Sequence, residues 1–167
     1  SLALGSDGNA YAWGYNYYGR LGDGTTTDRY TPVRVRTPDR NMYPDLPKDF
    51  TYVQVSAGWQ HSLALGSDGN AYAWGDNVNG KLGDGTTTDR YTPVRVRTPD
   101  RNMYPDLPKD FTYVQVSAGW LYSLALGSDG NAYAWGYNGY GELGDGTTTE
   151  RYTPVRVENA RPQHVPE

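Results

Sequence analysis

The stretch S-L-A-L-G-S-D-G-N-A-Y-A-W-G occupies residues 1–14, and the same fourteen letters return at residues 62–75 and 123–136. This spacing sets a repeat period of 61 residues. A period of this length suits one four-stranded sheet with its connections, and it exceeds that of the common two-helix repeats, which run to about 33–47 residues. The chain of 167 residues therefore holds two full periods and most of a third.

The middle unit divides into four short segments that read as β-strands. We name them A (residues 51–57), B (62–66), C (71–75) and D (91–97). The composition agrees, because 14% aromatic residues with 21 glycines and 11 prolines are typical of many short strands separated by turns. No helical periodicity is visible. The sequence thus predicts an all-β fold in which each unit is a four-stranded antiparallel meander.

Turn and edge signals support this division. The Asp-Gly pair at residues 68–69 predicts a tight B–C hairpin in which both residues take positive φ. Pro93 lies inside segment D and removes a ladder donor, so D is expected at the outer edge of its sheet. Alternation in segment A is expected to place Val53, Val55 and Ala57 on one face.

Large side chains of segments B and C are expected on one face of the sheet and small ones on the other. The large set is Leu63, Leu65, Tyr72 and Trp74, and the small set is Ala64, Ala71 and Ala73. Sheets stacked in series then press a bulky face against a small one, as close packing requires. We therefore favour stacked β-propeller blades over a solenoid, because a meander with an edge-like last strand is a blade pattern.

Along the chain the expected strands run B-C-D, then A-B-C-D twice. We expect an incomplete first blade at residues 1–36, a connection plus the second blade at 37–97, a connection plus the third blade at 98–157, and a divergent tail at 158–167. The chain thus has fewer than three complete blades. Because propellers have at least about four blades, we expect that the ring is incomplete unless chains assemble. Near-identical units indicate recent amplification or deliberate construction.

A longer stretch carries a family resemblance. Residues 57–85, A-G-W-Q-H-S-L-A-L-G-S-D-G-N-A-Y-A-W-G-D-N-V-N-G-K-L-G-D-G, resemble the repeat of the regulator-of-chromosome-condensation family. The resemblance covers all three units and implies a β-propeller, in that family usually of about seven blades. Members exchange nucleotide on a small GTPase, sense ultraviolet light in plants or inhibit β-lactamases in bacteria, so the resemblance implies a fold and no single activity.

Departures from the family pattern bear on which of these activities the resemblance implies. The connection at residues 36–49 is longer than the family commonly uses. Residues 58–62 (G-W-Q-H-S) are similar to the Gly-Trp-Arg-His-Thr elements of the plant photoreceptors, but Gln60 and Leu121 stand where those carry arginine. We therefore interpret Trp59 and Trp120 as structural. The inhibitors imply a more useful analogy, a propeller that binds a protein through an aromatic-rich loop face.

The units differ from one another almost only in their A–B and C–D connections, which emerge at the same end of a meander. We interpret this variation on a constant scaffold as a binding face, because tyrosine is enriched in protein contact surfaces. The alternative is that these side chains only fill permissive loops between blades. The candidate residues are Tyr15, Tyr17, Tyr18, Arg20, Gln60, His61, Asp76, Val78, Asn79, Lys81, Leu121, Tyr122, Tyr137, Tyr140 and Glu142.

Two functions of different classes stay open. The first is a non-catalytic module that recognises a protein or other macromolecule through the variable loops. The second is a structural or designed propeller fragment that self-associates through its open blade faces and has no ligand. The net charge of −4 argues against a nucleic-acid partner. No apolar stretch approaches the roughly 20 residues that span a membrane.

The sequence contains few residues of the kinds that catalyse reactions or bind metal ions. With no cysteine and only two histidines, His61 and His164, no nucleophile and base stand at a recognisable spacing. We expect no catalytic residue, metal or cofactor. The segment G-D-G-T at residues 22–25 lacks the alternating oxygen ligands of a calcium loop. We interpret it as a turn in which Asp23 and the threonines bond nearby backbone.

Overall fold

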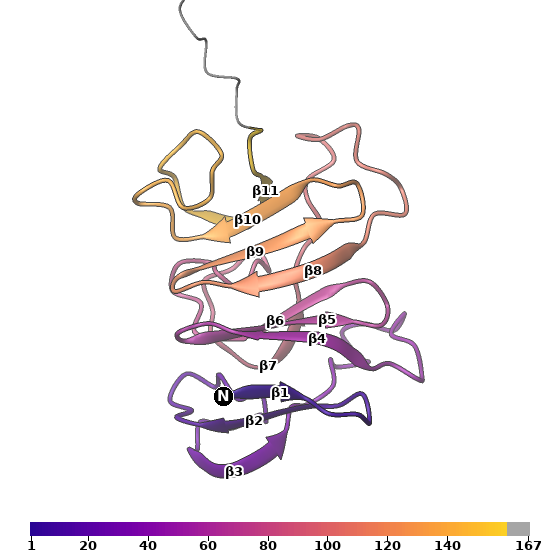
Figure 1. Cartoon of the computed structure of the whole chain (residues 1–167), viewed down its shortest axis with the longest axis vertical. Coiled ribbons are helices and arrows are strands. Elements are labelled where there is room, and N and C mark those ends of the chain that lie inside the picture. Colours follow the sequence, from indigo (N-terminus) through magenta and orange to yellow (C-terminus); the bar gives the residue numbers. More distant parts are fainter. Residues whose placement is uncertain (160–167) are drawn as a thin grey trace, which may run out of the picture.

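The computed structural model describes residues 1–159, which form eleven β-strands in three antiparallel sheets stacked in chain order (Figure 1). The all-β prediction is confirmed, and the described residues contain no helix that can cross a membrane. Of the predicted tail at 158–167, residues 160–167 lie outside the described part. The strands are β1 (Leu2–Leu4), β2 (Ala10–Gly14), β3 (Arg29–Arg34), β4 (Tyr52–Ala57), β5 (His61–Gly66), β6 (Ala71–Gly75), β7 (Arg90–Arg95), β8 (Tyr113–Ala118), β9 (Tyr122–Gly127), β10 (Ala132–Gly136) and β11 (Arg151–Arg156).

Each sheet is a meander of sequential strands. The second sheet has the order β4-β5-β6-β7 and the third β8-β9-β10-β11, while the first contains only β1-β2-β3. The expected B-C-D, A-B-C-D, A-B-C-D order is therefore confirmed for the described residues. Pro93 lies in β7, the outermost strand of its sheet, as expected from its missing donor.

The B–C turn differs from its prediction. Gly69 has a φ of 78°, but no described residue other than glycine has a positive φ. Asp68 therefore has a negative φ, and of the two only Gly69 takes the left-handed region that glycine tolerates. The Asp68 carboxylate fixes the turn by accepting hydrogen bonds from Asn70 N at 3.1 Å and from the Tyr72 hydroxyl at 2.6 Å.

Strand β4 contains a bulge that its alternating sequence does not reveal. The pairing with β5 shifts between Tyr52 and Gln54. The extra residue turns Val53 outward, where it is 49% exposed, and brings Tyr52 into the same core as Val55. The expectation that Val53 and Val55 lie on one face is therefore wrong.

The two faces of the second sheet also differ from expectation. Leu63 pairs with Ala73, and Ala64 pairs with Tyr72. Residues directly opposite each other in a ladder share a face, so each face combines large side chains from one strand with alanines from the other. The prediction of one bulky and one small face is wrong, because alternation within a strand does not determine its offset from the next strand.

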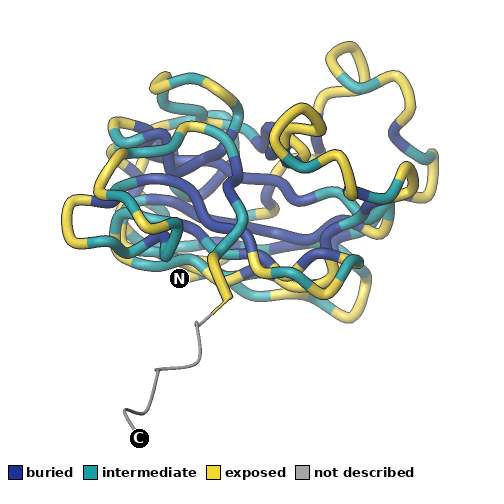
Figure 2. The backbone as a smooth tube through the Cα atoms, turned by 90° about the horizontal axis from the view of Figure 1, so that it is seen from above, coloured by how far each residue is buried: buried dark blue, intermediate teal, exposed yellow. Residues whose placement is uncertain are grey.

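These mixed faces make the contacts between blades. One face of the second sheet contributes Leu63 and Ala73 to a core shared with Tyr133 and Trp135 of the third blade. The opposite face contributes Tyr72, Trp74 and Ala64 to a core shared with the alanines of β2. In Figure 2 the strands form the buried centre, and exposed loops lie around it. The blades therefore stack as predicted, through a different arrangement of side chains.

Two straps connect one blade to the next. We define them as residues 35–51 and 96–112, which link β3 to β4 and β7 to β8. Within the first strap, the Arg40 guanidinium donates to the carbonyls of Leu46 at 2.7 Å and Pro47 at 2.8 Å. Leu46 and Phe50 are buried in the core of the second blade. Each strap is thus a compact segment that seals the end of the blade that follows it.

Candidate binding face

The A–B turns and C–D loops lie at one end of the stacked sheets, on the left in Figure 1. The pairing of His61 with Gly75 brings the start of β5 beside the end of β6, and Asp76 N donates to the Gln60 carbonyl at 3.0 Å. We call this end the loop face. It comprises residues 15–28, 58–60, 76–89, 119–121 and 137–150. The variable positions therefore gather at one end, opposite the straps.

A buried asparagine shapes each C–D loop. In the second blade the Asn77 amide donates to the carbonyls of Thr86 at 3.0 Å and Thr88 at 3.1 Å, and its oxygen accepts from Leu82 N at 3.0 Å. Asn16 and Asn138 make the same bonds in their blades. Sequence reasoning missed these residues, although a constant asparagine between variable neighbours was a visible signal.

Contacts between blades hold the loop face together. The Arg20 guanidinium of the first C–D loop donates to the Trp59 carbonyl at 2.7 Å. Gly24 N donates to the Tyr91 carbonyl of the next blade at 3.0 Å. A Cβ at Gly19, whose φ is 72°, would lie 2.3 Å from the Tyr91 ring. The first C–D loop therefore lies on the outer strand of the second blade, and the second loop lies on that of the third blade, where Gly85 N donates to the Tyr152 carbonyl at 3.0 Å.

Most of the candidate residues reach the surface of this face. Tyr17 is 63% exposed, Val78 62% and Tyr140 89%. Tyr17 packs on Tyr15 with ring centroids 6.3 Å apart, and the Arg20 guanidinium lies 4.8 Å over the Tyr15 ring. The candidate residues that are exposed or half-buried are Tyr15, Tyr17, Tyr18, Arg20, Gln60, Val78, Asn79, Leu121, Tyr122, Tyr137, Tyr140 and Glu142.

Neighbouring loops form two shallow hollows that bring candidates together. One is lined by Tyr18, Gln60 and Val78 with Tyr91. The other is lined by Tyr15, Arg20 and Trp59 among others. Residues far apart in the sequence thus contribute to shared concave surfaces between the first and second blades.

Three candidates, His61, Asp76 and Lys81, are instead buried between the second and third blades. Lys81 forms an ion pair with Asp76. The Ser123 hydroxyl donates to the Lys81 carbonyl at 2.7 Å, so it accepts from His61 Nε2 at 2.9 Å. Burial and the nearby charge of Lys81 lower the pKa of His61 to about 3, which keeps the ring neutral at pH 7. These residues join blades and are not accessible at the surface.

Trp59 and Trp120 differ from the interpretation that their role is structural. They are 52% and 60% exposed, and their rings lie 5.2 Å apart across the two A–B turns. Buried tryptophans of the core are instead Trp74 and Trp135. The two exposed rings form an apolar strip on the loop face that is common to both full A–B turns.

Asp23 is held by the bonds expected of a turn. Its Oδ1 accepts from Thr25 N at 2.9 Å and from the Thr25 hydroxyl at 2.7 Å. Its Oδ2 accepts from Arg29 Nε at 2.8 Å. The interpretation of residues 22–25 as a turn with threonine contacts is therefore confirmed, and both carboxylate oxygens serve the loop itself.

Stacked four-stranded meanders with a solvent-facing loop end define this chain as an array of propeller blades. The description "Regulator of chromosome condensation (RCC1) repeat" matches residues 7–65, 68–126 and 129–165, and a second model of the same repeat matches residues 52–81 and 113–142. The chain belongs to the RCC1 repeat family. This confirms the resemblance that the sequence of residues 57–85 indicated.

The chain is similar to much longer proteins. It is 34% identical over 170 residues to the ultraviolet-B receptor UVR8 of Arabidopsis thaliana, covering 99% of this chain and 34% of the receptor. It is 33% identical over 158 residues to the human E3 ubiquitin-protein ligase HERC2, covering 94% of this chain and 3% of the ligase.

Among solved structures it is similar to Prp20p of Saccharomyces cerevisiae, with a TM-score of 0.69 and 25% identity, covering 96% of this chain and 36% of Prp20p. Prp20p is described with its binding to Gsp1p and histones. The chain thus spans little more than a third, or less, of the length of each of these proteins.

Proposed function

We propose that this chain is a non-catalytic recognition module that binds a protein through the loop face. The observation that carries the proposal is the exposure of variable residues on that face. Tyr15, Tyr17, Val78 and Tyr140 are all more than half exposed. Aromatic side chains supply large contact areas at low entropic cost, which is why they dominate paratopes and hot spots.

The construction of the loops supports this proposal. A buried asparagine holds the main chain of each C–D loop, so exposed neighbours such as Val78 carry no structural bond of the loop core. The ligase activity in the name of HERC2 belongs to a protein of which this chain covers 3%. Prp20p, a structural neighbour that is described with protein partners, contains blades of the same fold as this chain.

A loop exchange tests the proposal. The first unit's Y-N-Y-Y at residues 15–18 is replaced by D-N-V-N, the sequence of residues 76–79. Binding of Gsp1p and of core histones to the immobilised chain and to this variant is measured by interferometry. We expect at least a tenfold loss for whichever protein binds, because three exposed or half-buried contact positions lose their aromatic rings.

The matched control is Met42→Ala, which changes a 55% exposed apolar residue on the strap, at the opposite end of the blades. It is expected to leave binding unchanged. Equal affinity of the loop-exchange variant and the parent chain would contradict a role for the loop face. An equal loss in both variants would point to a general effect on folding.

A second candidate function is self-association through the open blade faces. Leu126 of the third blade is 37% exposed, while its counterpart Leu65 is 8% exposed beneath the next blade. A second chain that supplies the equivalents of Tyr133 and Trp135 would cover this face in the same way. Light scattering tests the proposal, since a concentration-dependent mass that Leu126→Lys abolishes would support it and a constant monomeric mass would not.

A further inference from the structure

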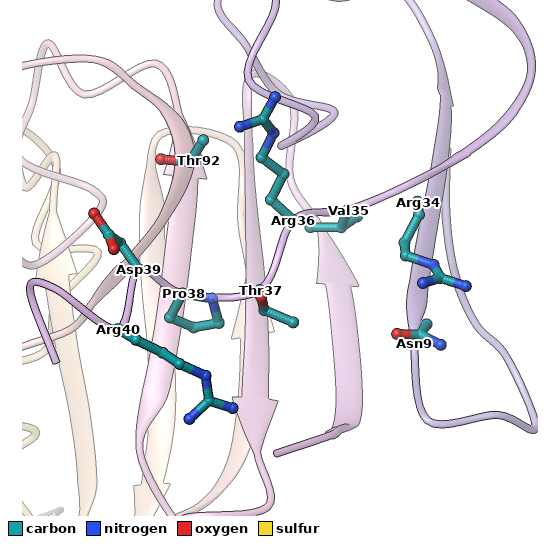
Figure 3. A pocket seen from close by; sticks show the side chains of 9 residues that line it. All are labelled: Asn9, Arg34, Val35, Arg36, Thr37, Pro38, Asp39, Arg40 and Thr92. Atoms are coloured by element: carbon teal, nitrogen blue, oxygen red, sulfur yellow. The ribbon is translucent and has the colours of Figure 1, made fainter. Parts of the chain in front are cut away.

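The loop face is acidic, whereas the opposite end of the blades is locally basic. The loop face contains eight carboxylates and two basic side chains, and the arginines that begin β3, β7 and β11 pair with three of the carboxylates. An excess of three negative charges remains, which is most of the chain's net charge of −4. At the opposite end, Arg34, Arg36 and Arg40 line one cavity with a single carboxylate, Asp39 (Figure 3). The loop face therefore favours a positively charged partner.

The two basic side chains of the loop face are already engaged by neighbouring residues. Lys81 is buried and forms an ion pair with Asp76. The Arg20 guanidinium lies 4.8 Å from the ring centroid of Tyr15 and 5.9 Å from that of Tyr18. Tyrosines of this face thus hold a guanidinium group by cation–π contact. The carboxylates that have no basic partner are left for a cation from outside the chain.

The hollow between the first two C–D loops combines such a carboxylate with aromatic rings. It is lined by Tyr18 of the first loop, Gln60 of the A–B turn, Val78 and Asp89 of the second loop and Tyr91 of β7, among others. We call it the Asp89 hollow. Both loops and β7 lie wholly within the described residues, so the walls of the hollow are complete in this chain.

Asp89 is oriented by its own loop and keeps one oxygen for a ligand. Its Oδ1 accepts a hydrogen bond from Asn77 N at 2.8 Å. The Asn77 amide also donates to the carbonyl of Thr88 at 3.1 Å, which fixes the main chain beside Asp89. No side chain among residues 1–159 forms a hydrogen bond or an ion pair with the Asp89 carboxylate. Its Oδ2 is therefore a preorganised acceptor, which lowers the cost of binding a ligand.

Packing of the first C–D loop on β7 fixes the aromatic side of the hollow. Tyr18 lies edge-on to Tyr17, with ring centroids 4.9 Å apart. The next residue, Gly19, lies directly on Tyr91, since a Cβ at Gly19 would be 2.3 Å from the Tyr91 ring. Tyr91 is nevertheless 46% exposed. The rings of Tyr18 and Tyr91 are therefore held close together and accessible to a ligand.

The corresponding carboxylate between the second and third C–D loops already has a partner. There Asn79 stands in place of Tyr18 and Glu150 in place of Asp89, and the Asn79 amide donates to Glu150 Oε1 at 2.8 Å. The loops pack on the outer strands in the same way in both places. Two residue differences thus leave one carboxylate open to a ligand and satisfy the other within the chain.

We propose that the loop face recognises a basic segment of its protein partner and that one arginine side chain of this segment enters the Asp89 hollow. The guanidinium group pairs with Asp89 and lies against the rings of Tyr18 and Tyr91, while its apolar stem lies along Val78. Arginine suits the hollow better than lysine, because its planar group combines stacking on a ring with hydrogen bonds to a carboxylate. This inference rests on the proposed function, for which it names the chemistry of the partner.

The test is an NMR titration of the isotope-labelled whole chain with capped tripeptides. The probe is Gly-Arg-Gly, and the comparison is Gly-citrulline-Gly, in which a neutral group of nearly the same shape replaces the guanidinium. We expect saturable shifts of the amide signals of Gln60, Asn77 and Asp89 with the arginine tripeptide. Binding of the citrulline tripeptide should be at least about threefold weaker. A lysine tripeptide should bind more weakly than the arginine tripeptide.

Two variants of the chain separate the carboxylate from the ring. Asp89→Asn keeps an acceptor for Asn77 N and removes the charge, and Tyr18→Asn introduces the residue that the second loop has at this position. Each is expected to weaken binding of the arginine tripeptide by about threefold or more. Glu150→Gln is the matched control, because it removes a charge that Asn79 already engages. It is expected to leave the affinity unchanged.

Several results would overturn the inference. They are equal binding of the arginine and citrulline tripeptides, unchanged affinity in either variant, or shifts confined to the third blade. Equal or tighter binding of the lysine tripeptide would overturn the choice of arginine.

Failure of this inference is distinguishable from failure of the proposed function. If the loop exchange at residues 15–18 abolishes binding of Gsp1p or histones while the arginine tripeptide does not bind, the loop face keeps its proposed function without the Asp89 hollow. If the tripeptide binds in the hollow and neither protein binds, the hollow is supported and the two proteins are excluded as partners.

Discussion

Replacing Leu63 with alanine measures how much the contact between two blades contributes to stability. Leu63 is 0% exposed and lies in the core between the second and third blades. Leu124 has the same position in the same local sequence, S-L-A-L-G, but it is only partly buried, because no described blade covers that face of the third sheet. The two residues thus differ in their neighbouring blade and not in their own strand.

The expected magnitudes follow from burial. Leucine-to-alanine changes at fully buried sites cost about 2–5 kcal/mol, since a cavity term adds to the lost transfer free energy. At Leu124 no closed cavity forms and part of the side chain is already in water, so we expect about 1 kcal/mol from transfer alone. Leu63→Ala should therefore lower the free energy of unfolding by at least about 1 kcal/mol more than Leu124→Ala.

The assay is urea unfolding of both variants, followed by tryptophan fluorescence and by far-ultraviolet circular dichroism. Coincident curves from the two probes establish that the free energies are comparable. Equal losses of stability would refute the reasoning, because they would mean that the third blade does not bury Leu63 in solution. A larger loss at Leu124 would indicate that another chain covers the open face.

Three further changes test individual contacts. Asn77→Ala is expected to cost about 2–3 kcal/mol in urea unfolding, because it leaves buried carbonyls and an N–H without partners, whereas the exposed Asn41→Ala is expected to cost less than about 0.5 kcal/mol. For His61, the folded pKa of about 3 lies below the unfolded value of about 6.5, so the unfolded state binds the extra proton. Stability should fall by up to about 1.4 kcal/mol per pH unit below pH 6.5, and a pH series of unfolding curves for His61→Gln should lack this component. Tyr104→Phe removes the acceptor of Arg156 N, and its thermal unfolding should report a loss of about 1 kcal/mol; an unchanged midpoint would contradict the role of the strap hydroxyl.

Strand existence and the variable end were predictable because they depend on local patterns. The period of 61 residues can be read directly from the sequence, and it predicted one meander per repeat. Pro93 lacks a backbone N–H wherever it lies, so it predicted the outer edge strand of the sheet. The bulge at Val53 and the pairing of Leu63 with Ala73 were not predictable in this way. Both depend on the offset between two strands, which only their packing determines.

The position of the candidate site was predictable from the sequence, but the accessibility of its side chains was not. Comparison of the units located the loop face, but it treated Lys81 like Tyr17, although one side chain is fully buried and the other is exposed. The difference arises from the third blade, whose serine and tryptophan contact the Lys81 carbonyl. The strap contact of Tyr43 with Arg95 spans 52 residues and has no local signature.

The asparagine at the centre of each C–D loop separates the shape of the loop from its surface chemistry. Asn77 bonds main-chain carbonyls and a main-chain N–H, and it leaves the residues on either side without a part in those bonds. Substitutions at exposed flanking positions such as Val78 therefore change what the surface presents at little cost in stability, whereas the buried Asp76 is held by its ion pair with Lys81. A library randomised at positions 15, 17 and 18, around the equivalent Asn16, should keep one backbone throughout. The blade can then diversify its specificity much as an antibody framework carries different hypervariable loops.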